Sequence, residues 1–245
     1  MELCDLFKQY MQHLFAGKRC EARELLFAAH DRGITASKLL HYIIWPAMEQ
    51  IDKLYRQDHI SRIVEHMASR INRMLGDQLQ GLLARKPKTG RRMVVLSGKG
   101  EIQELCAQMT ADLFEADGWC VWFLGCDVPN DEVLQFLGQV KPDILCFAGS
   151  NPFDVPEIRK LISLIREVGV CQQMQVLTVG GVFTRADSLS EEIRADLWAR
   201  NAREALELVA EHPMRVPKPD LPEPGRRRKC RRAMAVGAGR RVRTN

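Results

Sequence analysis

The feature that most constrains this fold is a change in hydrophobic periodicity near residue 90. Before it, apolar residues such as Ile60, Val64 and Met67 recur three or four positions apart, which is the spacing of one helix face. After it, short apolar runs alternate with amphipathic stretches, a pattern typical of a parallel sheet covered by helices on both faces. The sequence therefore predicts an N-terminal four-helix bundle followed by a doubly wound, parallel-sheet α/β domain of Rossmann or flavodoxin type.

The breaks in the pattern give approximate limits for the elements. The bundle, residues 1–86, is predicted to contain helices at 3–16, 19–31, 36–55 and 60–83. Pro46 should kink the third of these helices. The α/β domain, residues 91–212, is predicted to have strands at 93–96, 120–124, 144–148 and 176–179, with a short fifth strand at 196–198. Its helices are expected at 101–117, 131–139, 155–168 and 201–211, with a short one after Asp187.

The net charge of +5 is distributed unevenly. Residues 213–245 hold eleven Lys or Arg against two acidic residues, in a stretch rich in Pro and Gly, so the rest of the chain is mildly acidic. We expect this segment to be a disordered basic tail, with a weak nucleic-acid contact as one role open to it. Neither a membrane span nor a signal peptide is indicated, and we expect a cytoplasmic protein.

Several site classes are disfavoured by the motifs. The eight cysteines form no C-x-x-C pair, which argues against a zinc site and fits reduced thiols in the cytoplasm. The stretch Gly98-Lys99-Gly100 lacks the third glycine of a dinucleotide fingerprint, and no Walker pattern is present. Ligands of such sheets bind beyond the carboxyl ends of the strands, where Gly100, Gly180 and Gly181 leave space for a ligand.

The order of bundle, linker and α/β domain with Gly180-Gly181 after its fourth strand resembles the cobalamin-binding modules of methionine synthase, corrinoid methyl carriers and CarH-type light-dependent regulators. Residues 123–129, Phe-Leu-Gly-Cys-Asp-Val-Pro, resemble the motif after the family's second strand. The family's D-x-H-x-x-G loop maps onto Glu101, Gln103 and Cys106, so glutamine replaces the histidine that lies beneath the cobalt. The family's serine after strand three is missing or displaced to Ser150.

The resemblance extends to the bundle. In the light-responsive regulators a tryptophan followed ten residues later by Glu-His covers the upper face of the corrin, and here Tyr55 precedes Glu65-His66 at that spacing. The resemblance thus implies a cofactor between this helix and the glycine loops, with His66 as candidate cobalt ligand. The other histidines match nothing in the family and are interpreted as ordinary polar residues; they are His13, His30, His41, His59 and His212.

A carboxamide such as that of Gln103 is a poor cobalt ligand, which favours a sensor over a catalyst. We therefore expect a non-enzymatic, cobalamin-binding sensory or regulatory protein, responsive to light or redox state, that holds adenosylcobalamin or methylcobalamin. It would act through a regulatory partner or a homo-oligomer. Three alternatives stay open: a corrinoid methyl carrier of a methyltransferase system, a haem or bilin sensor with His66 and Cys106 as iron ligands, and an interaction module with an empty pocket.

Overall fold

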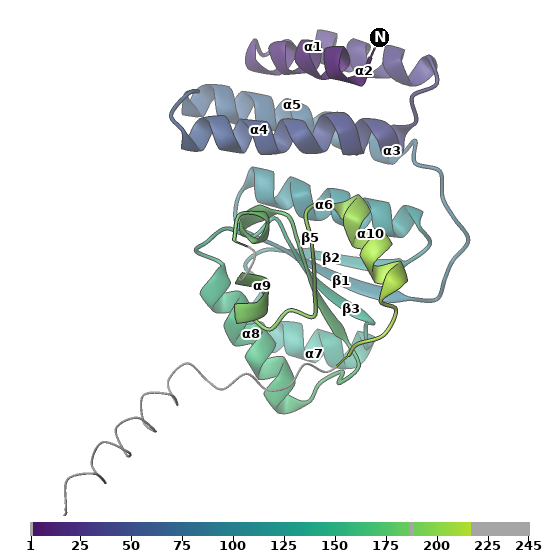
Figure 1. Ribbon diagram of the computed structural model, residues 1–245, viewed down its shortest axis with the longest axis vertical. Helices are drawn as coiled ribbons and strands as arrows, with labels where there is room; N and C mark the ends of the chain where they lie inside the picture. Colours follow the sequence, from purple (N-terminus) through teal and green to yellow (C-terminus); the bar gives the residue numbers. More distant parts are fainter. Residues whose placement is uncertain (1, 187–188, 217–245) are drawn as a thin grey trace, which may run out of the picture. The chain divides into compact units, whose positions relative to one another are not determined.

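The computed structural model describes residues 2–186 and 189–216, so most of the predicted basic tail lies outside the described residues. Figure 1 shows two layers of helices and an α/β layer, and the chain as far as Arg215 forms one unit. Among the described residues, no helix is both long enough and apolar enough to cross a membrane.

The predicted four helices form, but the third is divided. Helices α1 (Leu3–Phe15) and α2 (Arg19–Asp31) make the outer layer, and α5 (Arg62–Gln80) lies in the second layer. Beside α5 runs a segment in three parts, namely α3 (Ala36–Leu39), the π-helical turn η1 (Leu40–Ile44) and α4 (Trp45–Arg56). Pro46 at the start of α4 has no N–H to donate, and the widened turn before it replaces the simple kink that the sequence predicts.

A buried chain of hydrogen bonds holds this π-helical turn. The Asn72 side chain donates to the Ile44 carbonyl (3.1 Å) and accepts from the Tyr10 hydroxyl (2.9 Å). Both Asn72 and Tyr10 are fully buried. The Ile44 carbonyl, at the end of the π-helical turn, thus accepts a hydrogen bond from a side chain of α5, which in turn is held by α1.

The five predicted strands all form, and all pair in parallel. They are β1 (Arg92–Ser97), β2 (Cys120–Gly125), β3 (Ile144–Ala148), β4 (Gln175–Val179) and β5 (Leu197–Ala199). Their order in the sheet is β2-β1-β3-β4-β5. The chain turns away from β1 in both directions, so the β1/β3 pair is the switch point at which doubly wound sheets bind ligands.

The intervening helices cover both faces of the sheet. One face carries α6 (Glu101–Ala116) and α10 (Ala202–Glu211), and the other carries α7 (Asn130–Val140) and α8 (Val155–Val168). Two short elements, η2 (Gly181–Thr184) and α9 (Leu189–Glu192), follow β4. These bounds agree with the prediction to within one or two residues for most elements.

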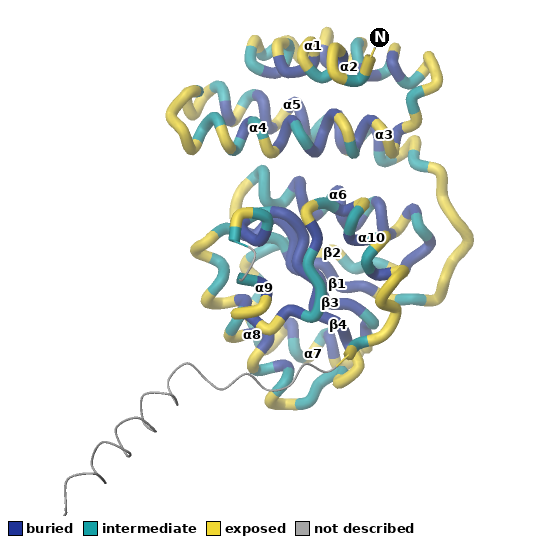
Figure 2. Tube along the Cα trace, in the orientation of Figure 1, coloured by how far each residue is buried: buried dark blue, intermediate teal, exposed yellow. Residues whose placement is uncertain are grey.

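The core places the helical layers against one face of the sheet. Alternate residues of the strands separate: Val95 and Cys146 face α6, whereas Val94 and Leu145 face α7 and α8. The α6 side continues without a break into the helical layers, because Ile44 and Leu105 belong to the same buried cluster. Figure 2 shows the central strands β1, β3 and β4 as buried throughout most of their length. This continuity packs the helical layers onto the side of the sheet that α6 covers.

Candidate functional site

A cavity of about 590 Å³ lies where the helical layer meets the carboxyl ends of the strands. We call it the interface cavity. Its roof comes from η1 and α4, and its floor from the start of α6 and the loops after β3 and β4. The volume falls in the usual range of small-molecule sites, and the position matches the switch point of the sheet. A ligand larger than a drug-sized molecule would extend beyond it.

The roof carries aromatic side chains and one imidazole. His41, Tyr42 and Trp45 all line the interface cavity from η1 and the start of α4. The His41 and Tyr42 rings meet edge to face with centroids 4.5 Å apart, and the Tyr42 hydroxyl accepts a hydrogen bond from Arg203 of α10 (3.2 Å). Burial lowers the pKa of His41, Arg203 lowers it further, and Glu207 acts in the opposite direction.

Carboxylates occupy the next two turns of the roof. Trp45 donates its indole N–H to Glu49 Oε1 (3.0 Å), and burial raises the pKa of Glu49 despite that hydrogen bond, with Asp52 adding to the rise. Asp52 pairs with Arg56 at 2.8 Å and with Arg185 from the segment after β4 at 3.4 Å. Arg185 therefore links the roof to the floor at one wall of the interface cavity.

The floor is held together by Asn151 in the loop after β3. Gln103 donates from Nε2 to Asn151 Oδ1 (3.1 Å), and Asn151 donates from Nδ2 to the Lys99 carbonyl (2.8 Å). The backbone N–H of Asn151 also donates to Asp154 Oδ2 (2.7 Å). The loops after β1 and β3 are thus tied side by side, and the Gln103 amide is oriented by a partner.

The glycines of the floor serve close packing. A Cβ at Gly180 would lie 3.3 Å from Cζ2 of Trp45, so the indole packs directly over this residue. At Gly181, with φ +60°, a Cβ would collide with the backbone of Ser150, a buried residue. Gly100 has φ +122° and lies under the Gln103 side chain. A bulky residue at Gly181 would therefore strain the fold itself, and its effect would not isolate ligand binding.

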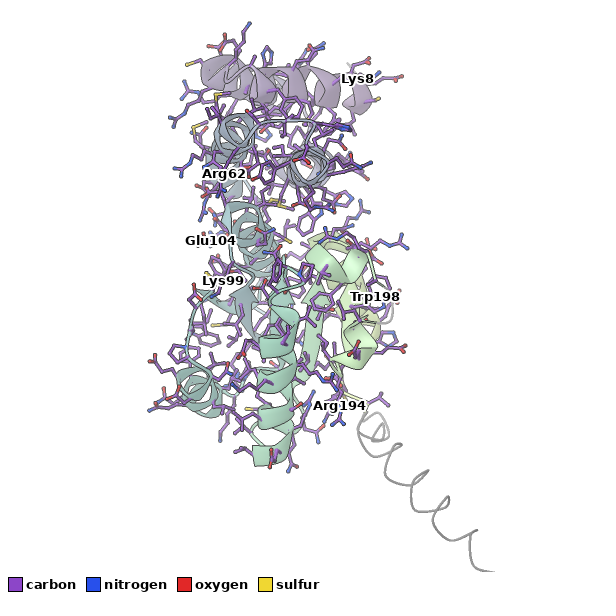
Figure 3. All side chains as sticks on the ribbon, turned by 90° about the vertical axis from the view of Figure 1, so that its left-hand side faces the viewer. Lys8, Arg62, Lys99, Glu104, Arg194 and Trp198 are labelled. Carbon is purple, nitrogen blue, oxygen red and sulfur yellow. The ribbon has the colours of Figure 1, made fainter. Side chains whose placement is uncertain are left out.

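The structure gathers some of the predicted site residues and separates others. Gln103, Ser150 and Gly181 line the interface cavity, with Gly100 and Gly180 immediately beside them. The predicted Glu101 instead faces α5, where its carboxylate lies 3.5 Å from the Arg73 guanidinium. Arg73 also pairs with Glu104 at 3.0 Å, and Figure 3 labels Glu104 beside the helical layer.

The residues expected to cover the ligand from the bundle lie outside the interface cavity. Tyr55, Glu65 and His66 are not among the described residues that line the interface cavity. Glu65 is buried and accepts a hydrogen bond from Ser69, and His66 is half exposed beside Glu65 (3.5 Å) and Arg62. The roof is formed by α4 in place of α5, because α4 and η1 are the part of the helical layer that packs over the strand ends.

Cys106 lies in the floor, as its place in the loop pattern suggested. Its side chain is buried, and burial raises the pKa of the thiol well above its ordinary value, with Cys146 and Glu49 adding to the rise. A thiol in this state is protonated at neutral pH, and only a thiolate is a strong metal ligand. The geometry therefore gives Cys106 a packing role beneath Gly180.

The motif at residues 123–129 belongs to a second cavity, of about 460 Å³. Gly125, Cys126 and Asp127 line it together with residues of α8. Lys99 closes one side through an ion pair with Asp127 at 2.5 Å, and Figure 3 labels Lys99 at this end of the sheet. This motif thus shapes the loop after β2 and does not reach the interface cavity.

Sequence reasoning missed His41, Trp45 and Asn151. The only sequence signal for the first two is Pro46, which marks an interruption without showing that the preceding turn faces the strand ends. Asn151 follows Ser150 directly, so the displaced serine motif pointed at the loop that carries both residues, and both line the interface cavity.

Comparison with known proteins agrees with this architecture. A family model described as a B12 binding domain matches residues 91–210, and a second model with the same description matches residues 6–80. The structure of the monomethylamine corrinoid protein of Methanosarcina barkeri has a TM-score of 0.75 at 18% identity, covering 86% of this chain and 100% of that one. At this identity the structural likeness establishes the fold.

Sequence relatives carry corrinoid names as well. Dimethylamine corrinoid protein 3 of Methanosarcina mazei is 23% identical over 150 residues, or 60% of this chain and 86% of that protein. Dimethylamine corrinoid protein 2 of Methanosarcina acetivorans is 22% identical over 193 residues, or 72% of this chain and 86% of the relative. With both family models matched in the expected order along the helical and α/β parts, the chain belongs to the B12-binding domain family.

Proposed function

We propose that this chain holds a corrinoid in the interface cavity and carries a methyl group for a separate methyltransferase, without itself being an enzyme. The observation that carries the proposal is the cavity between α4 and the strand ends, at the switch point of a sheet whose fold matches a corrinoid protein. When bound, the corrinoid would supply a cobalt ion that accepts and releases the methyl group. The chain's own residues bind it, orient it and exclude water.

The residues present fit a corrinoid whose lower face receives no imidazole from the protein. The Gln103 amide in the floor would be a weak ligand for cobalt, and it is already engaged with Asn151. In the roof, the exposed Tyr42 side chain offers apolar surface to a flat macrocycle, whereas Trp45 is buried against Gly180. The fit is therefore to a corrinoid that keeps its own base or leaves that position without a protein ligand.

The carrier is favoured over the sensor that the sequence suggested first. That interpretation rested on the weak Gln103 ligand and on a match that put Tyr55 and Glu65-His66 over the ligand. The Tyr55 and Glu65-His66 side chains do not line the interface cavity. The haem alternative depended on His66 together with Cys106, whose buried thiol is protonated. The relatives, by contrast, are named as corrinoid proteins of dimethylamine and monomethylamine.

Spectral titration tests the binding step. Purified protein should bind hydroxocobalamin in preference to haemin, as measured by equilibrium dialysis and the visible spectrum. Thr184→Trp, which fills the interface cavity, should weaken cobalamin binding by about tenfold or more. Ser37→Trp on an exposed turn of α3 is the matched control and should bind normally. Equal binding by both variants, each with an unchanged circular dichroism spectrum, would place the ligand elsewhere.

A second measurement separates carrier from sensor. After reduction, the corrinoid-loaded protein should react with methyl iodide to give the methylcobalamin spectrum. Illumination of the adenosylcobalamin-loaded protein should leave its elution volume in size-exclusion chromatography unchanged. A protein that is inert to methyl iodide but changes its oligomeric state in light would be a sensor.

A further inference from the structure

The imidazole of the interface cavity lies in its roof and not in its floor. His41 is the one histidine among the described residues that line this cavity. In the floor, Gln103 stands where the D-x-H-x-x-G motif of the family has histidine, and its amide is bound to Asn151. A nitrogen ligand from the protein would therefore have to approach the cobalt from the helical side.

We propose that His41 is the protein's axial ligand to the cobalt of a bound corrinoid in the state without a methyl group. The inference rests on the proposed corrinoid site and assigns the ligand within it. Imidazole is a good ligand for cobalt, whereas an amide engaged elsewhere and a protonated thiol are poor ones. His41 is thus the strongest donor that the lining residues offer.

The backbone around His41 is built to hold an unusual turn. His41 lies in the π-helical turn Leu40–Ile44, and the Ile44 carbonyl is satisfied by the buried Asn72 side chain. Such turns are rare and occur often at functional sites. Here the turn brings His41, Tyr42 and Trp45 to the roof of one cavity.

The groups around His41 restrict its ring. Tyr42 packs edge to face against it, and the Tyr42 hydroxyl is held by Arg203, which is held in turn by Glu207 at 3.0 Å. An oriented ring loses less freedom when it coordinates a metal than a free one does. His66, in comparison, is half exposed and lies between Glu65 and Arg62, outside the cavity.

Electron paramagnetic resonance can identify the ligand directly. The probe is cob(II)inamide, which lacks the nucleotide base of cobalamin, so any axial nitrogen must come from the protein. The wild-type complex should show each high-field cobalt line split into a triplet by ¹⁴N. Protein labelled with ¹⁵N-histidine should convert each triplet to a doublet. This comparison uses the unaltered chain and does not depend on a variant that folds.

Variants then assign the histidine. His41→Ala and His41→Gln should lose the splitting while retaining the protein's circular dichroism, and His66→Ala should keep it. With aquacobalamin, the red shift produced by an imidazole replacing the bound water should be present in the wild type and absent in His41→Ala. An unsplit wild-type spectrum with bound cobinamide, or a splitting that survives in His41→Ala, would overturn the assignment of His41 as ligand but not the proposed corrinoid site. Failure to bind either corrinoid would overturn the proposed function with it.

Discussion

Asp112 should destabilise the folded chain at neutral and alkaline pH. It lies on α6, where burial raises the pKa of its carboxyl from 3.8 to about 7, with Glu115 and Asp77 adding to the rise. Gln80, which hydrogen-bonds the carboxyl, and Arg85 act in the opposite direction but do not cancel it. The folded chain therefore holds a proton here that the unfolded chain has released.

The sign and size follow from these pKa values. The unfolded carboxyl ionises near pH 4 and the folded one near pH 7, so the stability contributed by the neutral form is lost as the pH rises between them. A rise from 3.8 to about 7 corresponds to at most about 4 kcal/mol. Because the side chain is only partly buried and solvent screens it, we expect about 1–3 kcal/mol.

Asp112→Asn removes the ionisation and keeps an amide able to hydrogen-bond Gln80. It should raise the free energy of unfolding by about 1–3 kcal/mol at pH 8 and by less than about half as much at pH 5. Urea denaturation followed by far-ultraviolet circular dichroism at the two pH values measures the difference. Asp5→Asn on the exposed face of α1 is the control and should change stability by less than about 0.5 kcal/mol. An increase in the free energy of unfolding that is equal at both pH values, or a decrease at pH 8, would refute the reasoning.

Three further predictions concern the ligand, a buried ion pair and the end of the described chain. Gln103→His should place an imidazole in the floor and tighten cobalamin binding by about tenfold. Combined with His41→Ala, it should restore the nitrogen splitting of bound cob(II)inamide, and an unsplit spectrum of this double variant would show that the floor loop lies out of reach of the cobalt. Asp196→Asn should cost about 3 kcal/mol in urea denaturation, because Arg166 (2.6 Å) and Arg215 (3.1 Å) both lose their anionic partner; a loss below 1 kcal/mol would mean that solvent replaces the pair. Truncation after His212 should lower the unfolding midpoint relative to truncation after Arg215, since only the shorter chain lacks that guanidinium; identical midpoints would make the contact dispensable.

The fold was predictable because its signals are local. Runs such as residues 144–148 alternate between the two faces of the sheet, and each is bounded by a helix with its own apolar stripe. Even the three-residue strand β5 was indicated by a short run containing Trp198. The π-helical turn was not, because its stability comes from Tyr10 and Asn72, which lie far from it in sequence.

The floor of the site was predictable in part for the same reason. Glycines after β1 and β4 must lie at one edge of a parallel sheet, so Gly100, Gly180 and Gly181 were expected together. The roof depends on which helix packs over that edge, and periodicity does not specify this. Both α4 and α5 present an apolar face to the core, and only the packing of whole layers decides between them.

Gln103 shows why a missing ligand was easier to detect than its replacement. The sequence places a glutamine where the family motif that it resembles has histidine, and the chemistry of the amide follows at once. It does not show that Asn151 holds this amide while tying two floor loops together. Nor does it show that a widened turn places His41 above the same cavity. Since the floor amide is engaged and the roof imidazole lines the cavity, coordination from the helical side is the arrangement that these residues favour.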